Sequence, residues 1–289
     1  MKMKKLRQIL SLAAISFAAI SCSGNKVEFD YVRLVNNDTG FTASDGDTAI
    51  AIGLKKGSSL KARIDTYLST LNQDSWTDLM GKMVALSAEN SNATYDAGNL
   101  NNDTSAGTFK VGMECGYIPY NWSQTNDKNG AVPIANNPGN YANGYDVQIA
   151  RQVANALNMK LEVYQYEWDA LLPAVQSGAI DGIVAGMSPT EERLKEIDFS
   201  EIYYRSNLVV VTRKNSKLME CKNLSELDQK GFKIAAQPGT FHLDALKAQT
   251  QNVTVIENLE DFVDMQIALE AGTIDGYVAE EPTALSFCN

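Results

Sequence analysis

The sequence predicts a two-lobed α/β protein, and two observations support that fold class. From residue 109 onward, short apolar segments alternate with segments whose apolar residues recur at helical spacing, in one block to residue 212 and another from 213 to 289. Such alternation favours mostly parallel sheets that bind ligands at the carboxyl ends of their strands. A chain of 289 residues is also long enough to fill two hydrophobic cores.

The elements of both blocks follow from apolar runs of strand length and from helical periodicity between turn residues. In the first block we expect strands at 109–115, 161–166, 180–184 and within 202–213, and helices at 144–157, from Trp168 and after Thr190. In the second block we expect strands at 233–236, 253–256 and 274–278, the last ending at Glu280, and helices at 241–249 and 259–271.

The first 21 residues have the features of an export signal. A basic start precedes an apolar run from Ile9 to Ile20 that is too short to span a membrane comfortably. Ala19-Ile20-Ser21-Cys22 resembles a lipobox, in which the chain is cut before a cysteine that receives lipid, and residues 22–26 then form a lipidated tether. The alternative is an ordinary signal followed by a chance cysteine. We expect attachment to the extracytoplasmic membrane face through this lipid only.

The segment between the tether and the first block carries further elements. A strand candidate runs from Glu28 to Leu34, and Thr48 to Leu54 is a short apolar strand. Two amphipathic helices follow, the first capped by Ser58 or Ser59 and the second beginning near Trp76.

The charge of the chain excludes some partners and its residue types predict no cofactor. The net charge is −10, and it becomes −14 without the first 21 residues, which hold four basic and no acidic side chains. Such an acidic body repels nucleic acid and anionic bilayers. His242 and the scattered cysteines show no metal-ligand spacing, so we expect no metal. Export permits a disulfide, but Cys115, Cys221 and Cys288 cannot all pair, and no spacing selects a pair.

The stretch from Tyr166 to Arg193 carries the clearest functional signal. Trp168 opens a short amphipathic helix that Gly178 ends, and a buried strand, a small-residue turn and a helix capped by Thr190 follow. A glycine turn before a helix start leaves backbone N–H groups for an anion, and the planar fork of Arg193 can hold a carboxylate by two hydrogen bonds. The pattern predicts a carboxylate site beside an aromatic wall. The alternative is a structural strand, turn and helix with a solvated arginine.

This stretch, YEWDALLPAVQSGAIDGIVAGMSPTEER, resembles the signature region of the polar amino acid-binding family of extracellular solute-binding proteins, bacterial solute-binding protein family 3. The resemblance covers nearly all of the chain after the signal and is strongest from Phe109 to Arg213. It implies a two-lobed periplasmic-binding-protein type II fold that closes on its ligand about hinge strands. It also implies capture of a polar L-amino acid and its delivery to the permease subunits of an ABC transporter, by a monomer that performs no catalysis.

The resemblance implies which residues hold the charged groups of an amino acid. Gly186 and Ser188 match the turn that contacts the α-carboxylate, and Arg193 matches the arginine that holds it. Thr240 matches the carboxylate contact of the second lobe. Glu280 matches the acid that accepts the α-ammonium, in a pair that is strong only when it is shielded from water.

Three further positions match residues that face the ligand side chain. Tyr117 and Trp168 match aromatic walls, although such rings often only pack against protein. Glu114 matches an acid that meets the side chain, although an acid at a strand end is usually solvated. Ala185 and Phe241 depart from the family pattern, since relatives often have polar residues there.

Two other functions remain open from the sequence alone. Relatives of this fold include a dehydratase, and Glu114 is the one cleft acid free for general acid–base work. An extracellular amino acid sensor that docks on a membrane partner is the second alternative. The identity of the amino acid does not follow from the sequence.

The order of the elements predicts a circular permutation of the family fold. Residues 27–47 complete lobe 2, residues 48–86 supply a hinge strand paired with Leu208 to Thr212 and helices of lobe 1, and residues 108–212 and 213–289 form the remainder of lobes 1 and 2. Residues 87–107, rich in Asn, Ser, Thr, Asp and Gly, form a flexible linker that joins the old termini. The rival account is a truncated tandem array.

We predict that Cys22→Ser releases the protein from membranes or leaves its signal uncleaved. The substitution removes the thiol that carries lipid while it preserves size. Membrane fractionation and mass spectrometry of the amino terminus measure the outcome. A wild-type protein that begins at another residue and carries no lipid contradicts the prediction.

Overall fold

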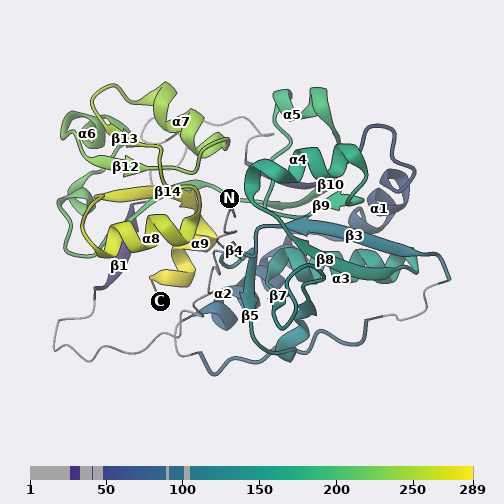
Figure 1. Ribbon diagram of the computed structural model, residues 1–289. Coiled ribbons are helices and arrows are strands. Elements are labelled where there is room, and N and C mark those ends of the chain that lie inside the picture. The colour runs from purple at the N-terminus through teal and green to yellow at the C-terminus, as the bar shows by residue number, and fades with distance from the viewer. Residues whose placement is uncertain (1–26, 33–40, 42–47, 89–90, 101–104, 289) are drawn as a thin grey trace, which may run out of the picture.

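The described part of the chain forms two lobes that lie side by side (Figure 1). The computed structural model describes residues 27–32, 41, 48–88, 91–100 and 105–288, so the predicted signal and the lipidated Cys22 lie outside the described residues. Each lobe holds a mixed five-stranded sheet with helices packed on it. The predicted two-lobed α/β fold is confirmed.

Lobe 1 is built on the sheet β10-β2-β9-β3-β8, in which β3 runs parallel to β8 and β9 while β2 runs antiparallel to β9 and β10. Its strands are β2 (Ala49–Leu54), β3 (Thr108–Met113), β8 (Lys160–Gln165), β9 (Gly182–Ile183) and β10 (Asp198–Arg205). Its helices are α1 (Lys61–Leu68), α2 (Gln73–Ser87), α3 (Tyr145–Leu157), α4 (Trp168–Ser177) and α5 (Glu191–Glu196). A small antiparallel sheet adds β4 (Gly116–Tyr117), β5 (Asn121–Gln124), β7 (Tyr141–Asn143) and β6 (Val132–Pro133).

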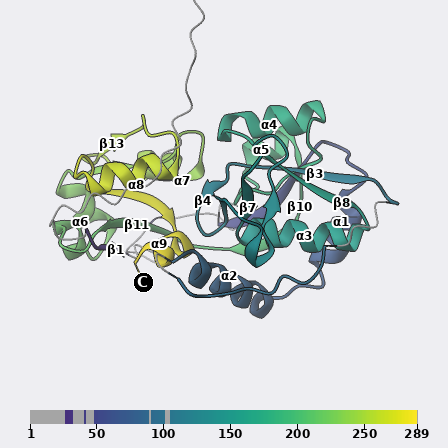
Figure 2. The same cartoon turned by 60° about the horizontal axis from the view of Figure 1, so that its bottom comes forward.

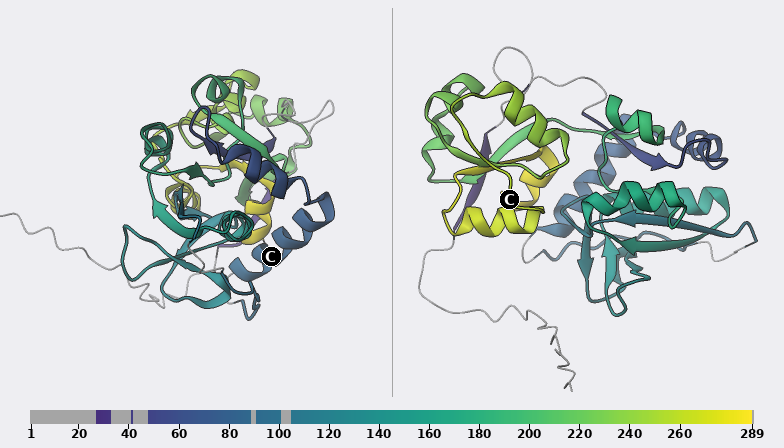
Figure 3. Two further views of the ribbon diagram at one scale, coloured as in Figure 1. Left: turned by 90° about the vertical axis from the view of Figure 1, so that its right-hand side faces the viewer. Right: turned by 45° about the horizontal axis from the view of Figure 1, so that its top comes forward.

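Lobe 2 is built on the sheet β1-β11-β14-β12-β13, in which β12 runs parallel to β13 and β14 while β1 and β11 are antiparallel neighbours. Its strands are β1 (Phe29–Val32), β11 (Leu208–Arg213), β12 (Lys233–Ala235), β13 (Thr254–Ile256) and β14 (Gly276–Glu280). Its helices are α6 (Leu224–Gln229), α7 (Phe241–Gln249), α8 (Phe262–Glu270) and α9 (Glu281–Phe287). Figure 3 shows these helices on both faces of the sheet.

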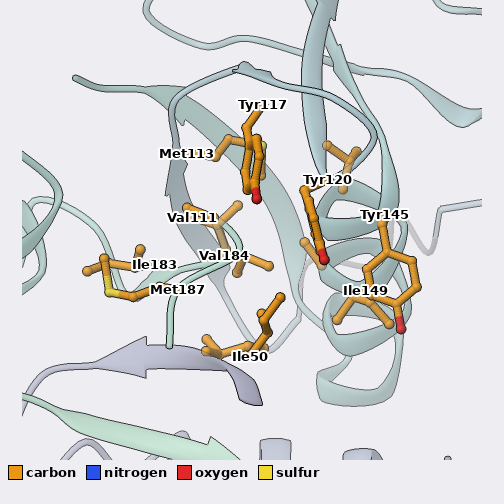
Figure 4. Close-up of a cluster of buried hydrophobic side chains, with 14 of the residues drawn as sticks. Ile50, Val111, Met113, Tyr117, Tyr120, Tyr145, Ile149, Ile183, Val184 and Met187 are labelled. Atoms are coloured by element: carbon orange, nitrogen blue, oxygen red, sulfur yellow. The ribbon is translucent and has the colours of Figure 1, made fainter. Parts of the chain in front are cut away.

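The core of lobe 1 forms where the apolar residues of its strands meet. All six residues of β2 are buried, as expected for a run of small and branched apolar side chains inside a sheet. Figure 4 shows Ile50 of β2, Val111 of β3 and Ile183 of β9 near the rings of Tyr117 and Tyr120. The core therefore reaches the edge from which the functional residues project.

The lobes are joined by a two-residue connection between β10 and β11. The backbone N–H of Ser206 donates to the carbonyl of Thr48 at 3.1 Å, and the carbonyl of Asn207 accepts from the N–H of Glu281 at 3.0 Å. A second contact lies below, where α2 packs beside α9 (Figure 2) and the hydroxyls of Ser87 and Ser286 are 3.1 Å apart. The hinge is therefore short and held by backbone bonds from both lobes.

Several predicted details of the first 86 residues and of the first block are wrong. The segment Thr48–Leu54 does not pair with Leu208–Thr212, because β2 lies between β9 and β10, and β11 instead pairs with β1 and β14. The first helix has Leu60 as its N-cap, without a side-chain cap, rather than Ser58 or Ser59. The sequence analysis also missed β10 and the small sheet of lobe 1.

The described part of the predicted linker lies against α3. Arg151 Nη2 donates to the carbonyl of Gly98 at 2.7 Å, and Asn155 Nδ2 donates to that of Asn99 at 3.2 Å. The backbone N–H of Tyr95 donates to Asn129 Oδ1 at 3.0 Å. These bonds hold an extended segment along lobe 1. Among the described cysteines, Cys115, Cys221 and Cys288 are unbridged.

We predict that Gly276→Ala lowers the free energy of unfolding by about 1 to 3 kcal/mol, because packed interiors resist added atoms. A Cβ at position 276 meets the carbonyl oxygen of Val211 at 2.8 Å, which is backbone and cannot turn aside. The matched control is Gly81→Ala in α2, where a Cβ meets nothing within 4 Å. It should stabilise the protein by about 0.5 to 1 kcal/mol through helix propensity. Urea unfolding measures both, and equal effects contradict the prediction.

Candidate functional site

A cavity lies between the two lobes and opens to solvent, and the volume in it that the centres of water molecules can occupy is about 20 Å³. Its wall comes from six residues of lobe 1 and six of lobe 2: Tyr117, Trp168, Ala185, Gly186, Ser188 and Arg193, and Gln237, Thr240, Phe241, His242, Phe262 and Glu280. Seven of the eight predicted ligand-binding residues line it. The eighth, Glu114, accepts a hydrogen bond from Gln237 of the wall at 2.7 Å. The structure therefore brings all eight together, and their binding roles stay predictions.

Arg193 and Trp168 form the outer edge of the cavity and contact lobe 2 directly. The guanidinium carbon of Arg193 lies 5.2 Å from the centroid of the Trp168 ring, in a cation–π contact. Arg193 Nη1 donates to the carbonyl of Ser188 at 2.9 Å, and its Nη2 donates to that of Gly239 at 3.0 Å. Trp168 Nε1 donates to the same carbonyl of Gly239 at 3.1 Å. One carbonyl of lobe 2 therefore accepts from two residues of lobe 1.

The guanidinium of Arg193 carries a charge that no carboxylate of the described residues pairs with. Burial lowers the pKa of Arg193 to about 10, and the more distant Asp244 and Glu192 oppose that shift. The group therefore stays protonated at neutral pH. Two of its five N–H donors reach carbonyl oxygens, so others are available to an anion.

The start of α7 supplies backbone donors to the cavity wall. Thr240, Phe241 and His242 all line it, and the first N–H groups of a helix have no partner within the helix. The hydroxyl of Thr240 donates to the carbonyl of Gln237 at 2.7 Å, which fixes the turn before α7. The anion site predicted at the start of α5, the helix that carries Arg193, stays a prediction. Both helices have exposed acids in the first turn, Glu191 and Glu192 in α5 and Asp244 in α7.

The turn at Gly186 needs glycine for two reasons. Its φ is +62°, a conformation that other residues adopt at a cost, and a Cβ there meets Cε1 of Tyr117 at 3.0 Å. Its backbone also bonds to the buried carboxylate of Asp146. That carboxylate accepts from the hydroxyl of Tyr203 at 2.7 Å and from Nδ2 of Asn121 at 2.8 Å. The sequence analysis missed this supporting acid, which reads as an ordinary polar position in a helix.

Tyr117 stacks between two rings rather than standing free in the cavity. Its centroid lies 4.8 Å from that of Tyr120 and 4.1 Å from that of Phe262 on α8. Figure 4 shows the rings of Tyr117 and Tyr120 next to each other. Its hydroxyl has no hydrogen-bond partner among the described residues. Phe262 was not predicted as a site residue. A helix was expected from residue 259, but α8 begins at Phe262, and the ring at this first helical position lines the cavity.

Glu114 lies behind the cavity wall at the end of β3. Its Oε1 accepts from Gln237 Nε2, which also donates to the carbonyl of Glu260 at 3.0 Å. Burial raises the pKa of Glu114 to about 7, although the bond from Gln237 opposes the shift. The side chain can therefore be protonated or charged near neutral pH.

Glu280 and His242 form a buried pair on the lobe 2 side. Nε2 of His242 lies 2.9 Å from Oε1 of Glu280, while Nδ1 and Oε2 have no partner among the described residues. Burial raises the pKa of Glu280 to about 8. Burial and the nearby Arg193 lower the pKa of His242 to about 3. The sequence analysis considered His242 only as a metal ligand and missed its place beside Glu280, which no local pattern indicates.

In the part of the chain that the structure describes, no three side chains of His, Cys, Asp or Glu gather as they would around a metal ion. None of its helices has the length and apolar character needed to cross a bilayer.

Comparisons with known proteins agree with this geometry. A probable histidine-binding protein of Campylobacter jejuni is 30% identical over 202 residues, which are 70% of each chain. The L-cystine-binding protein TcyJ of Escherichia coli is 29% identical over 209 residues, or 72% of each chain. The glutamine-binding protein GlnH of Bacillus subtilis is 31% identical over 140 residues, so the chain spans half the length of that relative.

Solved structures give the same fold. An amino acid ABC transporter substrate-binding protein from Streptococcus pneumoniae, bound to L-arginine, matches with a TM-score of 0.54 and 30% identity over 62% of this chain and 68% of that chain. An ancestral amino acid-binding protein that is a precursor of cyclohexadienyl dehydratase matches with a TM-score of 0.52 and 26% identity, over 61% of this chain and 71% of that chain.

The family model for bacterial extracellular solute-binding proteins, family 3, matches residues 109–264, which is more than half of the chain and includes most of the cavity wall. The chain belongs to family 3 of the bacterial extracellular solute-binding proteins.

Proposed function

We propose that the protein captures a polar L-amino acid by its charged head group and delivers it to the permease of an ABC transporter. The observation that carries the proposal is that one cavity wall holds both a cationic Arg193 and a buried Glu280 with an unpartnered oxygen. The α-carboxylate binds Arg193, Ser188 and the N–H groups at the start of α7. The α-ammonium binds Glu280 on the other side.

The polar character of the ligand side chain follows from its neighbours in the cleft. Glu114 offers the second oxygen of its carboxyl beside the wall, while both N–H donors of Gln237 are already bonded to Glu114 and to the carbonyl of Glu260. Relatives of this chain are named for histidine, glutamine, arginine and cystine, all of which carry polar or charged side chains. A cationic or amide side chain can bond to the carboxyl of Glu114, whose pKa near 7 lets it ionise when a cation arrives.

Hinged closure explains how the ligand is held and released. Contacts cross between the lobes at Trp168 and Arg193 to Gly239, at Glu114 to Gln237 and at Tyr117 to Phe262. They form only when the lobes meet, so opening about the connection between β10 and β11 breaks them together. We propose no catalytic step, since recognition and release need none.

We further propose that a lipid on Cys22 anchors the monomeric protein on the extracytoplasmic face, where it meets the permease. The family to which the chain belongs is extracellular by its description. An acidic body needs such an anchor, because its own surface repels anionic lipid. The membrane experiment on Cys22 tests this step.

We also propose that the chain is a circular permutant of the family fold. The support is that β1 lies in the sheet of lobe 2 and β2 in that of lobe 1, although both precede the segment that the family model matches. The helix α9 packs against β1, so the last and the first elements of the described chain lie near each other, as a permuted order requires.

A chain in which residues 27–86 are moved behind residue 289, without residues 87–107, tests the permutation. We predict that it folds and binds its ligand as the original order does, because every strand pairing of the two five-stranded sheets is kept and only the contacts of residues 87–107 are lost. Circular dichroism and calorimetry measure the outcome. A rearranged chain that does not fold contradicts the proposal and favours a truncated tandem array.

A thermal-shift screen of the twenty L-amino acids tests the proposed function. We predict that one or a few polar members raise the melting temperature by several degrees, since a ligand at 100 times its dissociation constant adds about 2.7 kcal/mol. No shift with any of the twenty contradicts the proposed function.

We predict that Arg193→Ala weakens binding of that amino acid by about 2 to 4 kcal/mol, because the α-carboxylate stays buried without its charged partner. Arg63→Ala in α1 is the matched control. It removes the same charge and a 2.6 Å bond to the carbonyl of Leu157, far from the cavity wall. Calorimetry should find the control near wild type, and equal losses in both variants exclude Arg193 from the site.

A further inference from the structure

His242 and Glu280 form a buried pair that shares one hydrogen bond and leaves one nitrogen and one oxygen without a partner among the described residues. His242 sits in the first turn of α7, and Glu280 is the last residue of β14. Their exposed fractions are 6% and 7%, and the 2.9 Å bond between Nε2 and Oε1 is the one they share. The unpartnered Nδ1 and Oε2 belong to side chains that line the cavity. A donor that enters the cavity therefore meets an acceptor that the protein leaves unsatisfied.

The charges around the pair are few among the described residues. The positive charge of Arg193 on α5 lowers the pKa of His242. The carboxylate of Glu281, which follows Glu280 in the chain, accepts a hydrogen bond from the hydroxyl of Tyr31 on β1 at 3.5 Å. Asp244 and Lys247 of α7 are exposed, as are Asp264 and Glu270 of α8. Leu208 of β11 opposite Glu280, Phe262 of α8 with its ring 6.0 Å from His242, and Tyr117 of the cavity wall are neutral. One further titratable group lies at the cavity: Glu114, bonded to Gln237 of the wall, has a pKa raised by burial to about 7.

Burial decides how many protons the pair holds. An ionised carboxylate with one donor and no cation beside it is costly away from water, so Glu280 and His242 together hold one proton and are neutral as a pair. The proton resides on Glu280, because burial and the positive charge of Arg193 both disfavour an imidazolium. The pKa of Glu280, raised to about 8, and that of His242, lowered to about 3, agree in direction with this assignment.

We propose that Glu280 and His242 form a proton-exchanging ammonium site, in which the α-ammonium of the ligand replaces the proton that the pair holds. The inference rests on the proposed function. The O–H bond of Glu280 breaks and its proton leaves to solvent, while N–H donors of the ammonium bond to the resulting carboxylate. His242 then donates Nε2–H to Oε1 and leaves Oε2 to the ligand. His242 is a positioning residue in this scheme.

The exchange makes capture dependent on pH. Above about pH 8 the unliganded pair has already lost its proton, and the ammonium binds without exchange. Below that pH each binding event must first remove a proton, so the affinity falls about tenfold for each pH unit. Acidification therefore favours release, and the effect reverses as the pH rises.

Calorimetry in buffers of different ionisation enthalpy tests the exchange. The probe is the L-amino acid that stabilises the protein most in the thermal-shift screen, titrated at pH 7 in phosphate and in Tris. We expect release of close to one proton per ligand from the pair, with a further fraction from Glu114 when the side chain of the ligand is cationic, and an affinity about tenfold weaker at pH 6 than at pH 7. Binding with heat that is independent of buffer, and affinity that is flat with pH, overturns the inference and leaves the proposed function intact. Absence of binding by all twenty amino acids overturns both.

Variants at the pair separate the proton-holding role of Glu280 from the positioning role of His242. Glu280→Gln keeps the shape but cannot hold an exchangeable proton, so its weaker binding should release about one proton fewer than that of the wild type. His242→Gln keeps a donor toward Oε1 and should preserve proton release, whereas His242→Leu removes that donor and should shift the pH dependence upward. Proton release in Glu280→Gln that equals that of the wild type contradicts the assignment.

The imidazole can be observed directly, because His242 is the single histidine in the sequence. In protein without added histidines, the ring ¹⁵N signals need no further assignment. We expect a neutral ring from pH 5 to 8, and a change at Nε2 when the amino acid is added. A ring that is charged at pH 7 without ligand contradicts the proposed position of the proton.

Discussion

The wall of the cavity depends on one buried carboxylate, that of Asp146 at the start of α3. It accepts hydrogen bonds from Asn121, Tyr203 and the backbone of Gly186, which belong to the small sheet, to β10 and to the turn before α5. A buried charge is tolerable only when donors surround it. Burial raises the pKa of Asp146 to about 6 while these bonds oppose the shift, so the carboxylate is mostly charged at neutral pH. Three elements far apart in the sequence are thereby fixed to one point.

The two lobes contribute different polar groups to the cavity. Arg193 belongs to lobe 1 and Glu280 to lobe 2, so in the proposed mode of binding the carboxylate of a zwitterion contacts one lobe and its ammonium contacts the other. The carbonyl of Gly239 and the ring of Phe262 add neutral contacts across the same gap. In that proposal the head group of the ligand contributes to closure, and the side-chain contacts decide which amino acid is bound.

Local signals in the sequence predicted much of this arrangement. Trp168 begins α4, Gly178 ends it in the left-handed conformation with φ of 79°, and Thr190 caps α5, because each of these effects acts within one helical turn. The strand partners were harder to predict. The segment Thr48–Leu54 was recognised as a buried strand, but its composition does not say which strand it joins.

The residues that the sequence analysis missed share one property. His242, Phe262 and Gln237 act through partners that are distant in the chain, and each looks ordinary in its own segment: a helix position, a helix start and a turn before a helix. The strand β10 was missed because its polar and aromatic residues lack a clear apolar alternation. Family resemblance predicted which residues contact the head group, whereas the buried pair required the three-dimensional structure.

The two hydrogen bonds to the carbonyl of Gly239 bear on how long the lobes stay closed. Trp168 and Arg193 donate to the same oxygen, so separation of the lobes breaks both bonds at once and exposes all three groups to water. Residence time is the inverse of the dissociation rate, and differences between related complexes lie mostly in that rate. In the proposed function, the bonds at this edge of the cleft therefore lengthen the time for which the ligand stays bound, and with it the number of encounters with a transporter during one capture.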